Sequence, residues 1–339
     1  MEILVVGGAG YIGSFVSRML LAEGYRPTVL DNLSLGHRAA LDPRIPLVTG
    51  DLADDGLLQR LFRDRRFDAV MHFAALAAVG ESVQMPLTYY RNNVANTLNL
   101  LAAMKNAGVA RFIFSSSAAI FGTPERIPID ETHPARPINP YGRSKLMVEE
   151  ILRDAAAAGD LQSVALRYFN AAGASPDGRM GEDHRCETHL IPLVLKAVLG
   201  GAKSGARLKV FGTDYPTPDG TCVRDYIHVS DLARAHLLAV DYLAAGGASA
   251  AFNLGNGKGF SVMEVIRTAE KVTGRKVAFE TADRRAGDPA VLVAAANRIS
   301  RELGWQPAYP TLEAIIETAW KWHASHPDGY AASQAGPQG

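Results

Sequence analysis

The stretch MEILVVGGAGYIGSFVSRMLLAEGYRPTVLD, residues 1–31, decides the fold. Its first apolar run, residues 3–6, is short and aliphatic, which predicts a buried parallel strand. The run ends in a G-x-x-G-x-x-G turn formed by Gly7, Gly10 and Gly13, and a helix-like apolar pattern follows. In such a unit Gly7 permits the tight turn, Gly10 lets backbone N–H groups approach a pyrophosphate, and Gly13 lets helix and strand pack closely. The pattern therefore predicts a dinucleotide-binding unit.

A second strand, RPTVLD, ends at Asp31. A carboxylate at this point accepts hydrogen bonds from the hydroxyls of an adenosine ribose and repels a 2′-phosphate, so the predicted cofactor is NAD rather than NADP. The structural alternative is that Asp31 only caps the start of a helix.

Strand-like and helix-like segments continue to alternate beyond residue 31. The predicted strands are IPLVTGDLAD, DAVMHFAAL and ARFIFSSSAAIFG, and the predicted helices between them are GLLQRLFRDRRF and PLTYYRNNVANTLNLLAAMKNAG. This alternation is typical of βαβ units and predicts an α/β protein with a Rossmann-type, doubly wound parallel sheet. Ligands of such sheets lie beyond the carboxyl ends of the strands. Asp51, Phe73 and the serines 115–117 fall at these ends and are therefore candidate site residues.

A tyrosine and a lysine stand four residues apart in NPYGRSKLMVEE, residues 139–150. Residues at i and i+4 share one face of a helix, so the Lys145 ammonium is predicted to lie near the Tyr141 phenol and to lower its pKa from about 10. A base with such a lowered pKa abstracts protons efficiently near neutral pH. The plain alternative is a surface tyrosine beside a solvated lysine.

The composition indicates a globular protein without a strong charge bias. Of 339 residues, 47% are apolar and 21% are charged, and 35 basic residues balance 35 acidic ones. This balance points to neither a nucleic acid nor a membrane surface as a partner. Cys186 and Cys222 are the only cysteines, which argues against a disulfide framework and favours the cytoplasm. We expect no signal peptide, since Met1 leads directly into a strand, and no membrane span, since no uncharged apolar stretch reaches about 18 residues.

With its glycine turn, strand-end serine and Tyr-x-x-x-Lys helix, the sequence resembles the extended short-chain dehydrogenase/reductase family. Longer motifs narrow the resemblance to the UDP-glucose 4-epimerase branch of that family. They include GGAGYIGS, MHFAALAAVGESVQMPLTYYRNNV, FIFSSSAAIFG, LRYFNAAGASP and FGTDYPTPDGTCVRDYIHVSDLA, and the resemblance covers about residues 1–325. It implies tightly bound NAD and a UDP-sugar substrate, with C4 epimerisation of UDP-galactose and UDP-glucose through a 4-keto intermediate.

The resemblance also implies a role for each matching residue. Tyr141 would take the proton of the sugar 4-hydroxyl, Lys145 would lower the pKa of Tyr141 and bond the nicotinamide ribose, and Ser117 would bond the 4-oxygen. The residues implied to hold NAD are Gly7, Gly10, Tyr11, Ile12, Gly13, Asp31, Asn32, Asp51, Leu52, Phe73, Ala74, Ala75, Asn92 and Phe169, together with Ser117, Tyr141 and Lys145. The residues implied to contact the UDP-sugar are Asn170, His189, Leu190, Phe211, Arg224, Arg285, Asp288 and Leu292, together with Ser117 and Tyr141.

Two arginines of the implied substrate site have structural alternatives. Arg224 could pair only with Asp225 or Asp231, and Arg285 could be an ordinary loop residue. A guanidinium group binds a diphosphate bidentately, and UDP needs at least two such partners, which favours the binding role.

His189 and Leu292 also have structural alternatives. His189 is predicted to hydrogen-bond or pack rather than to bind a metal, because no His, Asp or Glu cluster has the spacing of a metal site, and no metal is expected. The resemblance implies that Leu292 limits the space beside C2 of the sugar. Its alternative is a core residue of the strand-like run AVLVAA, facing away from the ligand. Ser115 and Ser116 are interpreted as structural.

The predicted organisation is two domains and a tail. They are a Rossmann NAD-binding domain of residues 1–171 completed by about 222–255, a mixed α/β UDP-sugar-binding domain of residues 172–221 and 256–328, and a flexible tail of residues 331–339. A helix N-capped near Ser230 or Asp231 is predicted to cover the sheet. The resemblance further implies a homodimer formed through the helices that begin near Pro86 and Tyr141.

Three other functions stay open at this point. Nucleotide-sugar 4,6-dehydratases and decarboxylases share the Tyr-x-x-x-Lys helix but need an added carboxylate where this chain has Ala118 and Ala119. A 4-epimerase of a related sugar, UDP-N-acetylglucosamine or UDP-xylose and UDP-arabinose, fits the same motifs. A non-catalytic NAD-sensing regulator is disfavoured, because such proteins usually lose the tyrosine or the lysine.

Overall fold

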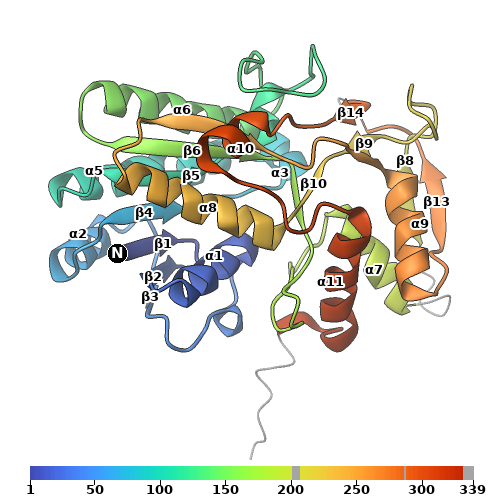
Figure 1. Ribbon diagram of the computed structural model, residues 1–339, viewed down its shortest axis with the longest axis horizontal. Coiled ribbons are helices and arrows are strands. Elements are labelled where there is room, and N and C mark those ends of the chain that lie inside the picture. The colour runs from blue at the N-terminus through green and yellow to red at the C-terminus, as the bar shows by residue number, and fades with distance from the viewer. Residues whose placement is uncertain (201–206, 286–287, 331–339) are drawn as a thin grey trace, which may run out of the picture.

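A parallel sheet with helices on both faces lies beside a smaller part made of helices and short strands (Figure 1). The structure is a computed structural model and describes residues 1–200, 207–285 and 288–330. The predicted tail, residues 331–339, lies outside the described residues. Within the described ranges, none of the helices combines the length and the apolar content needed to cross a lipid bilayer.

In the part of the chain that the structure describes, seven strands form the central sheet. They are β1 (Glu2–Val6), β2 (Arg26–Asp31), β3 (Leu47–Thr49), β4 (Ala69–His72), β5 (Arg111–Ser115), β6 (Gln162–Tyr168) and β11 (Ala250–Leu254). Their order is β11-β6-β5-β4-β1-β2-β3, and each neighbouring pair is parallel. The order reverses on either side of β1, which is the switch point at which doubly wound sheets bind ligands. The predicted fold class is confirmed.

Helices cover both faces of this sheet. The helical segments around it are α1 (Tyr11–Ala22), α2 (Asp55–Asp64), α3 (Val79–Gln84), α4 (Pro86–Tyr90), η2 (Arg91–Ala95), α5 (Asn96–Asn106), η3 (Ala118–Phe121), α6 (Pro140–Ala157) and α8 (Val229–Ala244). Ile3 and Val5 pack in one core with side chains of α1 and α8, whereas Leu4 and Val6 pack in another with side chains of α2, α5 and α6. Successive side chains of a strand point to opposite faces, so the apolar run of β1 supplies both cores.

The smaller part has an apolar core of its own. Its main elements are α7 (Leu190–Gly200), β8 (Leu208–Phe211), α9 (Val262–Thr273), β13 (Phe279–Ala282) and α11 (Leu312–Ser325). Val194, Ile266 and Ile316 are among the buried side chains of this core. The predicted boundaries between the two domains stay a prediction, which this separate core supports.

Short elements connect the two parts. They are η1 (Arg38–Ala40), β7 (Asn170–Ala172), β9 (Val223–Arg224), β10 (Tyr226–His228), β12 (Phe260–Ser261), β14 (Val291–Leu292) and α10 (Asn297–Leu303). Strand β7 pairs with β10, and β9 lies between β12 and β14. Residues 223–228 therefore pair with β7, the next strand after β6, and with β12, the next strand after β11.

The long helix predicted from Pro86 is confirmed, since α4, η2 and α5 follow one another without a break. The middle segment η2 is π-helical, and such segments are frequent at functional sites. The predicted cap of α8 was wrong. Helix α8 is capped by His228, whose Nδ1 accepts a hydrogen bond from the Ser230 nitrogen at 3.1 Å. The Asp231 carboxylate instead accepts from the nitrogens of Ala308 and Tyr309, at 2.7 and 2.9 Å, and so holds a distant loop.

Candidate active site

The glycine turn between β1 and α1 is closely packed. Gly7 has a φ of 76°, which favours glycine, and a Cβ there would lie 2.5 Å from the Ala74 nitrogen. A Cβ on Gly13 would collide with the carbonyl oxygen of Gly7. Gly10 is the N-cap of α1 and supplies no side-chain hydrogen bond, so the N–H groups of the first turn have no side-chain cap. Such N–H groups at a helix N-terminus fit a pyrophosphate, as the sequence predicts.

The carboxylate predicted to select NAD is ordered by the glycine turn. Asp31 accepts hydrogen bonds from the nitrogens of Ala9 and Leu33, at 2.9 and 2.8 Å. Asp31 caps no helix, so its alternative role as a helix N-cap is wrong. Asp51, just beyond β3, accepts from the Asn32 side chain at 2.6 Å. Carboxylate oxygens accept more than one bond, so both acids keep capacity for ribose hydroxyls.

The other residues predicted to hold NAD come from neighbouring strand ends. Phe73 and Ala74 donate their backbone N–H groups to the carbonyl oxygen of Val6, at 2.8 and 3.2 Å, beside the glycine turn. Asn92 lies in η2, and Phe169 directly follows β6. Phe73, Ala74 and Phe169 thus follow the carboxyl ends of β4 and β6, whereas Asn92 comes from a helical segment. Their roles toward NAD stay predictions.

Ser117, Tyr141 and Lys145 meet where β5 and α6 approach each other. Asn139 caps α6 by accepting from the Gly142 nitrogen at 2.8 Å, which fixes the start of the helix and hence the position of Tyr141. The Ser117 hydroxyl lies near the Tyr141 phenol and acts to lower its pKa. Lys145 donates from Nζ to the carbonyl oxygen of a β5 residue at 2.8 Å, and Nζ lies 6.0 Å from the centroid of the Tyr141 ring.

The pKa values of the two groups differ from the sequence expectation. Burial raises the pKa of Tyr141, although the nearby Ser117 hydroxyl opposes the rise, so the predicted lowering of the phenol pKa is absent in this state. Burial lowers the pKa of Lys145 to about 7, opposed by the charge of Glu149. The expectation rested on helical spacing alone and took no account of burial, which disfavours the charged form of both groups.

A buried ionic network lies behind Lys145, and the sequence reasoning missed it. Glu149 forms an ion pair with Arg167, whose Nε lies 3.0 Å from Oε1, and it accepts from the Ser116 hydroxyl at 2.5 Å. Glu149 follows Lys145 by one helical turn, and this spacing was the available signal. Ser115 bonds the Tyr168 hydroxyl, so both serines have structural partners, in line with their structural interpretation.

The residues predicted to bind the UDP-sugar converge around β9 and β14. Arg224 forms an ion pair with Asp288, not with Asp225 or Asp231 as its structural alternative required. The Arg285 guanidinium lies 4.1 Å from the centroid of the Phe211 ring. An arginine on an aromatic face and an arginine on a carboxylate are both oriented without losing their positive charge.

Leu292 lies beside Arg224. It is the strand partner of Arg224 in the β14–β9 pair. Together with Phe169 it packs against a small buried cluster that contains Ile120 and Phe121, in the segment η3 that begins after Ser117. Leu292 therefore faces the catalytic serine segment, but its effect on the sugar stays a prediction.

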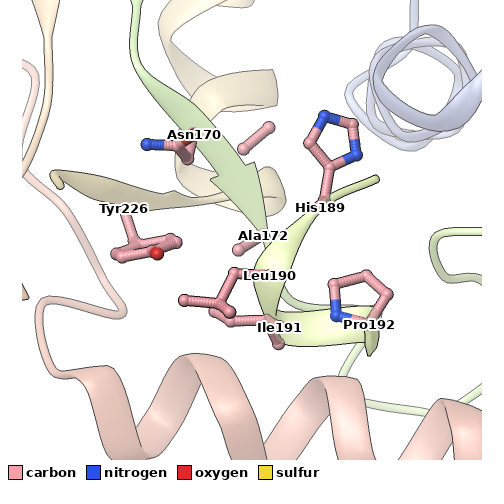
Figure 2. Close-up of a pocket in the computed structure, with 8 residues that line it drawn as sticks. Asn170, Ala172, His189, Leu190, Ile191, Pro192 and Tyr226 are labelled. Carbon is pink, nitrogen blue, oxygen red and sulfur yellow. The ribbon is translucent and has the colours of Figure 1, made fainter. Parts of the chain in front are cut away.

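Asn170, His189 and Leu190 line a small cavity (Figure 2). The Asn170 side chain donates to the Asp225 carbonyl oxygen at 2.9 Å, which fixes its orientation. Tyr226 closes another side of the cavity. Three of the predicted substrate residues are thus brought together, at the junction of the sheet and the smaller part.

The expectation of no metal stays a prediction, although the fold gathers four possible ligands that sequence spacing did not reveal. Within the described residues, Glu182, His184, Glu187 and His189 place one candidate ligand atom each within 4.8 Å of one another. The sequence reasoning missed this group, although the segment GEDHRCETH carried the signal.

A doubly wound parallel sheet with a glycine turn after its first strand, and with Ser117, Tyr141 and Lys145 at its carboxyl edge, is the arrangement of an NAD-dependent enzyme. The family described as NAD dependent epimerase/dehydratase matches residues 3–255. The chain belongs to this family.

Individual relatives are similar to this chain over almost its whole length. The UDP-glucose 4-epimerase of Halalkalibacterium halodurans is 51% identical over 338 residues, covering 100% of both chains. The crystal structure of UDP-glucose 4-epimerase from Brucella ovis in complex with NAD superimposes with a TM-score of 0.91 at 49% identity, covering 94% of this chain and 97% of that one. The enzyme from Bifidobacterium longum, in complex with NAD⁺ and UDP, gives a TM-score of 0.91 at 41% identity, covering 97% and 100%.

Proposed function

We propose that this chain is a 4-epimerase that interconverts UDP-galactose and UDP-glucose with tightly bound NAD. The observation that carries the proposal is the convergence of three side chains: Ser117, just beyond β5, lies near Tyr141, and Lys145 follows Tyr141 by one turn of α6. Full-length relatives at about half identity are named UDP-glucose 4-epimerases, which supports the same substrate.

The chain's own groups handle the proton of the sugar. Tyr141 takes the proton of the 4-hydroxyl, and the Ser117 hydroxyl holds the 4-oxygen in line with it. Tyr141 must be a phenolate to accept this proton and becomes a neutral phenol on doing so; the Lys145 ammonium would stabilise the phenolate before the transfer. Bound NAD supplies the hydride acceptor and donor at C4, so the cycle has no net redox change.

Epimerisation requires that hydrogen leave one face of the sugar and return to the other. The nucleotide must therefore stay anchored while the 4-keto sugar turns. Arg224 and Arg285 are suited to this task, because their guanidinium groups are held by Asp288 and by the Phe211 ring. Arginine forks match diphosphate oxygens bidentately.

The competing functions are less well supported. Ala118 and Ala119 begin η3, so this segment offers no carboxylate to a 4,6-dehydratase or decarboxylase reaction. Tyr141 and Lys145 are both present, which disfavours a purely regulatory NAD-sensing protein. Epimerisation of UDP-N-acetylglucosamine or of the pentose pair UDP-xylose and UDP-arabinose uses the same machinery and differs only at C2 or C5.

The purified protein tests the proposal without added cofactor. UDP-galactose is supplied, UDP-glucose is measured with a coupled dehydrogenase, and the acid supernatant of the protein is assayed for nucleotide. We expect conversion and about one NAD per chain. Turnover only with added NAD, or recovery of NADP, would contradict the proposal, and conversion of a pentose sugar alone would favour the related epimerase.

We propose that the active form is a homodimer and that it works in the cytoplasm. Exposed apolar side chains gather on α3 to α6, with Leu87 81% exposed and Leu98 and Met147 lining one open depression. Exposed apolar surface of this kind marks protein contacts. The free thiols of Cys186 and Cys222 suit a reducing compartment.

Light scattering tests the dimer. Leu98→Asp should halve the measured mass, whereas Ile127→Asp, on an exposed apolar residue outside these helices, should leave it unchanged. A monomeric mass for the unmodified protein would contradict the homodimer.

A further inference from the structure

Two histidines and two glutamates come together in the segment between β7 and α7. Glu182, His184, Glu187 and His189 lie within eight consecutive residues, and His189 directly precedes α7. Both histidines present Nδ1 to both carboxylates. The Nδ1 atom of His189 lies 2.7 Å from Glu182 and 3.3 Å from Glu187, and that of His184 lies 3.4 and 3.3 Å from the same two residues.

These distances fit a tetrahedral metal site. Zinc–nitrogen and zinc–oxygen bonds of about 2.0–2.2 Å place neighbouring ligand atoms of a tetrahedron about 3.3–3.6 Å apart. Nδ1 of His184 lies in this range of both carboxylates, 3.4 Å from Oε1 of Glu182 and 3.3 Å from Oε2 of Glu187, and Nδ1 of His189 lies closer to Oε1 of Glu182, at 2.7 Å. Calcium and magnesium prefer all-oxygen ligands, whereas imidazole favours zinc and its neighbours.

The charge of the group matches a divalent cation. The Glu182 and Glu187 side chains are each only 4% exposed, and two buried carboxylates are costly unless positive charge balances them. A divalent cation supplies this positive charge while both imidazoles stay neutral, as metal ligation requires.

We propose that Glu182, His184, Glu187 and His189 form a structural site for a four-coordinate divalent cation of the zinc class. All four ligands come from the chain, as in structural rather than catalytic zinc sites. The backbone of the segment is anchored on both sides, since Trp322 donates to the Glu182 carbonyl oxygen at 3.4 Å and the His37 ring bonds that of Asp183 at 3.1 Å. The cation would fix His189 where it lines the cavity with Asn170 (Figure 2).

Cobalt is the probe, because tetrahedral Co²⁺ has visible absorption bands that octahedral aqueous Co²⁺ lacks at comparable strength. The chelator-treated full-length protein is titrated with Co²⁺ and then with Zn²⁺. We expect one Co²⁺ per chain with tetrahedral bands, and displacement by Zn²⁺. His184→Gln should weaken binding by more than the about 10–100-fold that loss of an outer-shell partner costs. Glu280→Gln, on an exposed glutamate of β13, should bind as the unmodified protein does.

Thermal unfolding keeps the test valid if His184→Gln misfolds. Zn²⁺ should raise the Tm of the unmodified, chelator-treated protein, since a ligand that binds only the folded state stabilises it. Absent tetrahedral bands, an unchanged Tm, or equal Co²⁺ binding by His184→Gln would each overturn the proposal. None of these measurements uses a UDP-sugar, so they are independent of the proposed activity.

Discussion

Lys145 donates a hydrogen bond from Nζ to the carbonyl oxygen of Ser115, 2.8 Å away, and so joins α6 to the end of β5. The ammonium is buried, and Glu149 is the acidic group whose charge favours its protonated form. Burial therefore makes the positive charge of Lys145 costly in the folded chain.

The first prediction concerns stability and pH. Burial lowers the pKa of Lys145 to about 7, from about 10.4 in an unfolded chain. Between these values the unfolded chain binds more protons, so the contribution of Lys145 to the free energy of unfolding rises with pH. From pH 7 to pH 9 the rise should be about 2 kcal/mol relative to Lys145→Met, measured by urea unfolding of both NAD-free proteins. A difference that stays constant with pH would show that Lys145 titrates normally.

The second prediction isolates the base. Tyr141→Phe should lower kcat by about 10²- to 10⁴-fold, the usual loss when a general base is removed, while circular dichroism stays unchanged. Tyr242→Phe, in α8 and outside the site, is the matched control and should keep normal turnover. Near-normal turnover of Tyr141→Phe at pH 8 would refute the assignment.

The third prediction uses two consecutive arginines. Arg285 lies over Phe211, and Arg284 lies over Tyr215 and bonds Asp214 at 2.7 Å. Of these two neighbouring arginines, only Arg285 is assigned to the diphosphate. Arg285→Lys should raise KM for UDP-galactose about tenfold, or about 1.4 kcal/mol, with kcat within a few-fold, because lysine cannot bind bidentately. Arg284→Lys should leave KM unchanged, and equal effects of the two substitutions would remove the assignment.

The fourth prediction concerns the sugar C2 substituent. Leucine at position 292 should exclude an acetamido group at a cost of about 1–3 kcal/mol, or roughly 10- to 200-fold in kcat/KM. Leu292→Ser should therefore raise kcat/KM for UDP-N-acetylglucosamine and leave that for UDP-glucose within a few-fold. The control is Val291→Ser, since its neighbouring strand position points to the opposite face. If the ratio of the two sugars does not change in Leu292→Ser, Leu292 is only a packing residue.

Local patterns predicted the sheet because local chemistry dictates it. The aliphatic run 3–6, the glycines of the turn and the carboxylate of Asp31 each have one dominant structural role, and β1, α1 and β2 follow it. The strand ends then placed Ser117 and Asp51 at the correct edge of the sheet without any tertiary information.

What the sequence could not provide were the contacts made across the fold. The cap of α8 depends on the His228 imidazole, because Asp231 is committed to a loop more than seventy residues away. The raised pKa of Tyr141 follows from burial, which helical spacing does not encode. The ion pair of Arg224 and Asp288 also joins residues far apart in the chain.

The most direct test of the central claim is a proton NMR measurement in ²H₂O. The purified protein is incubated with UDP-galactose and no added nucleotide, and the product is examined at C4. We predict UDP-glucose that keeps protium at C4, because the hydrogen removed from C4 returns to the same sugar without exchanging with solvent. Deuterium at C4, or no UDP-glucose at all, would contradict the account.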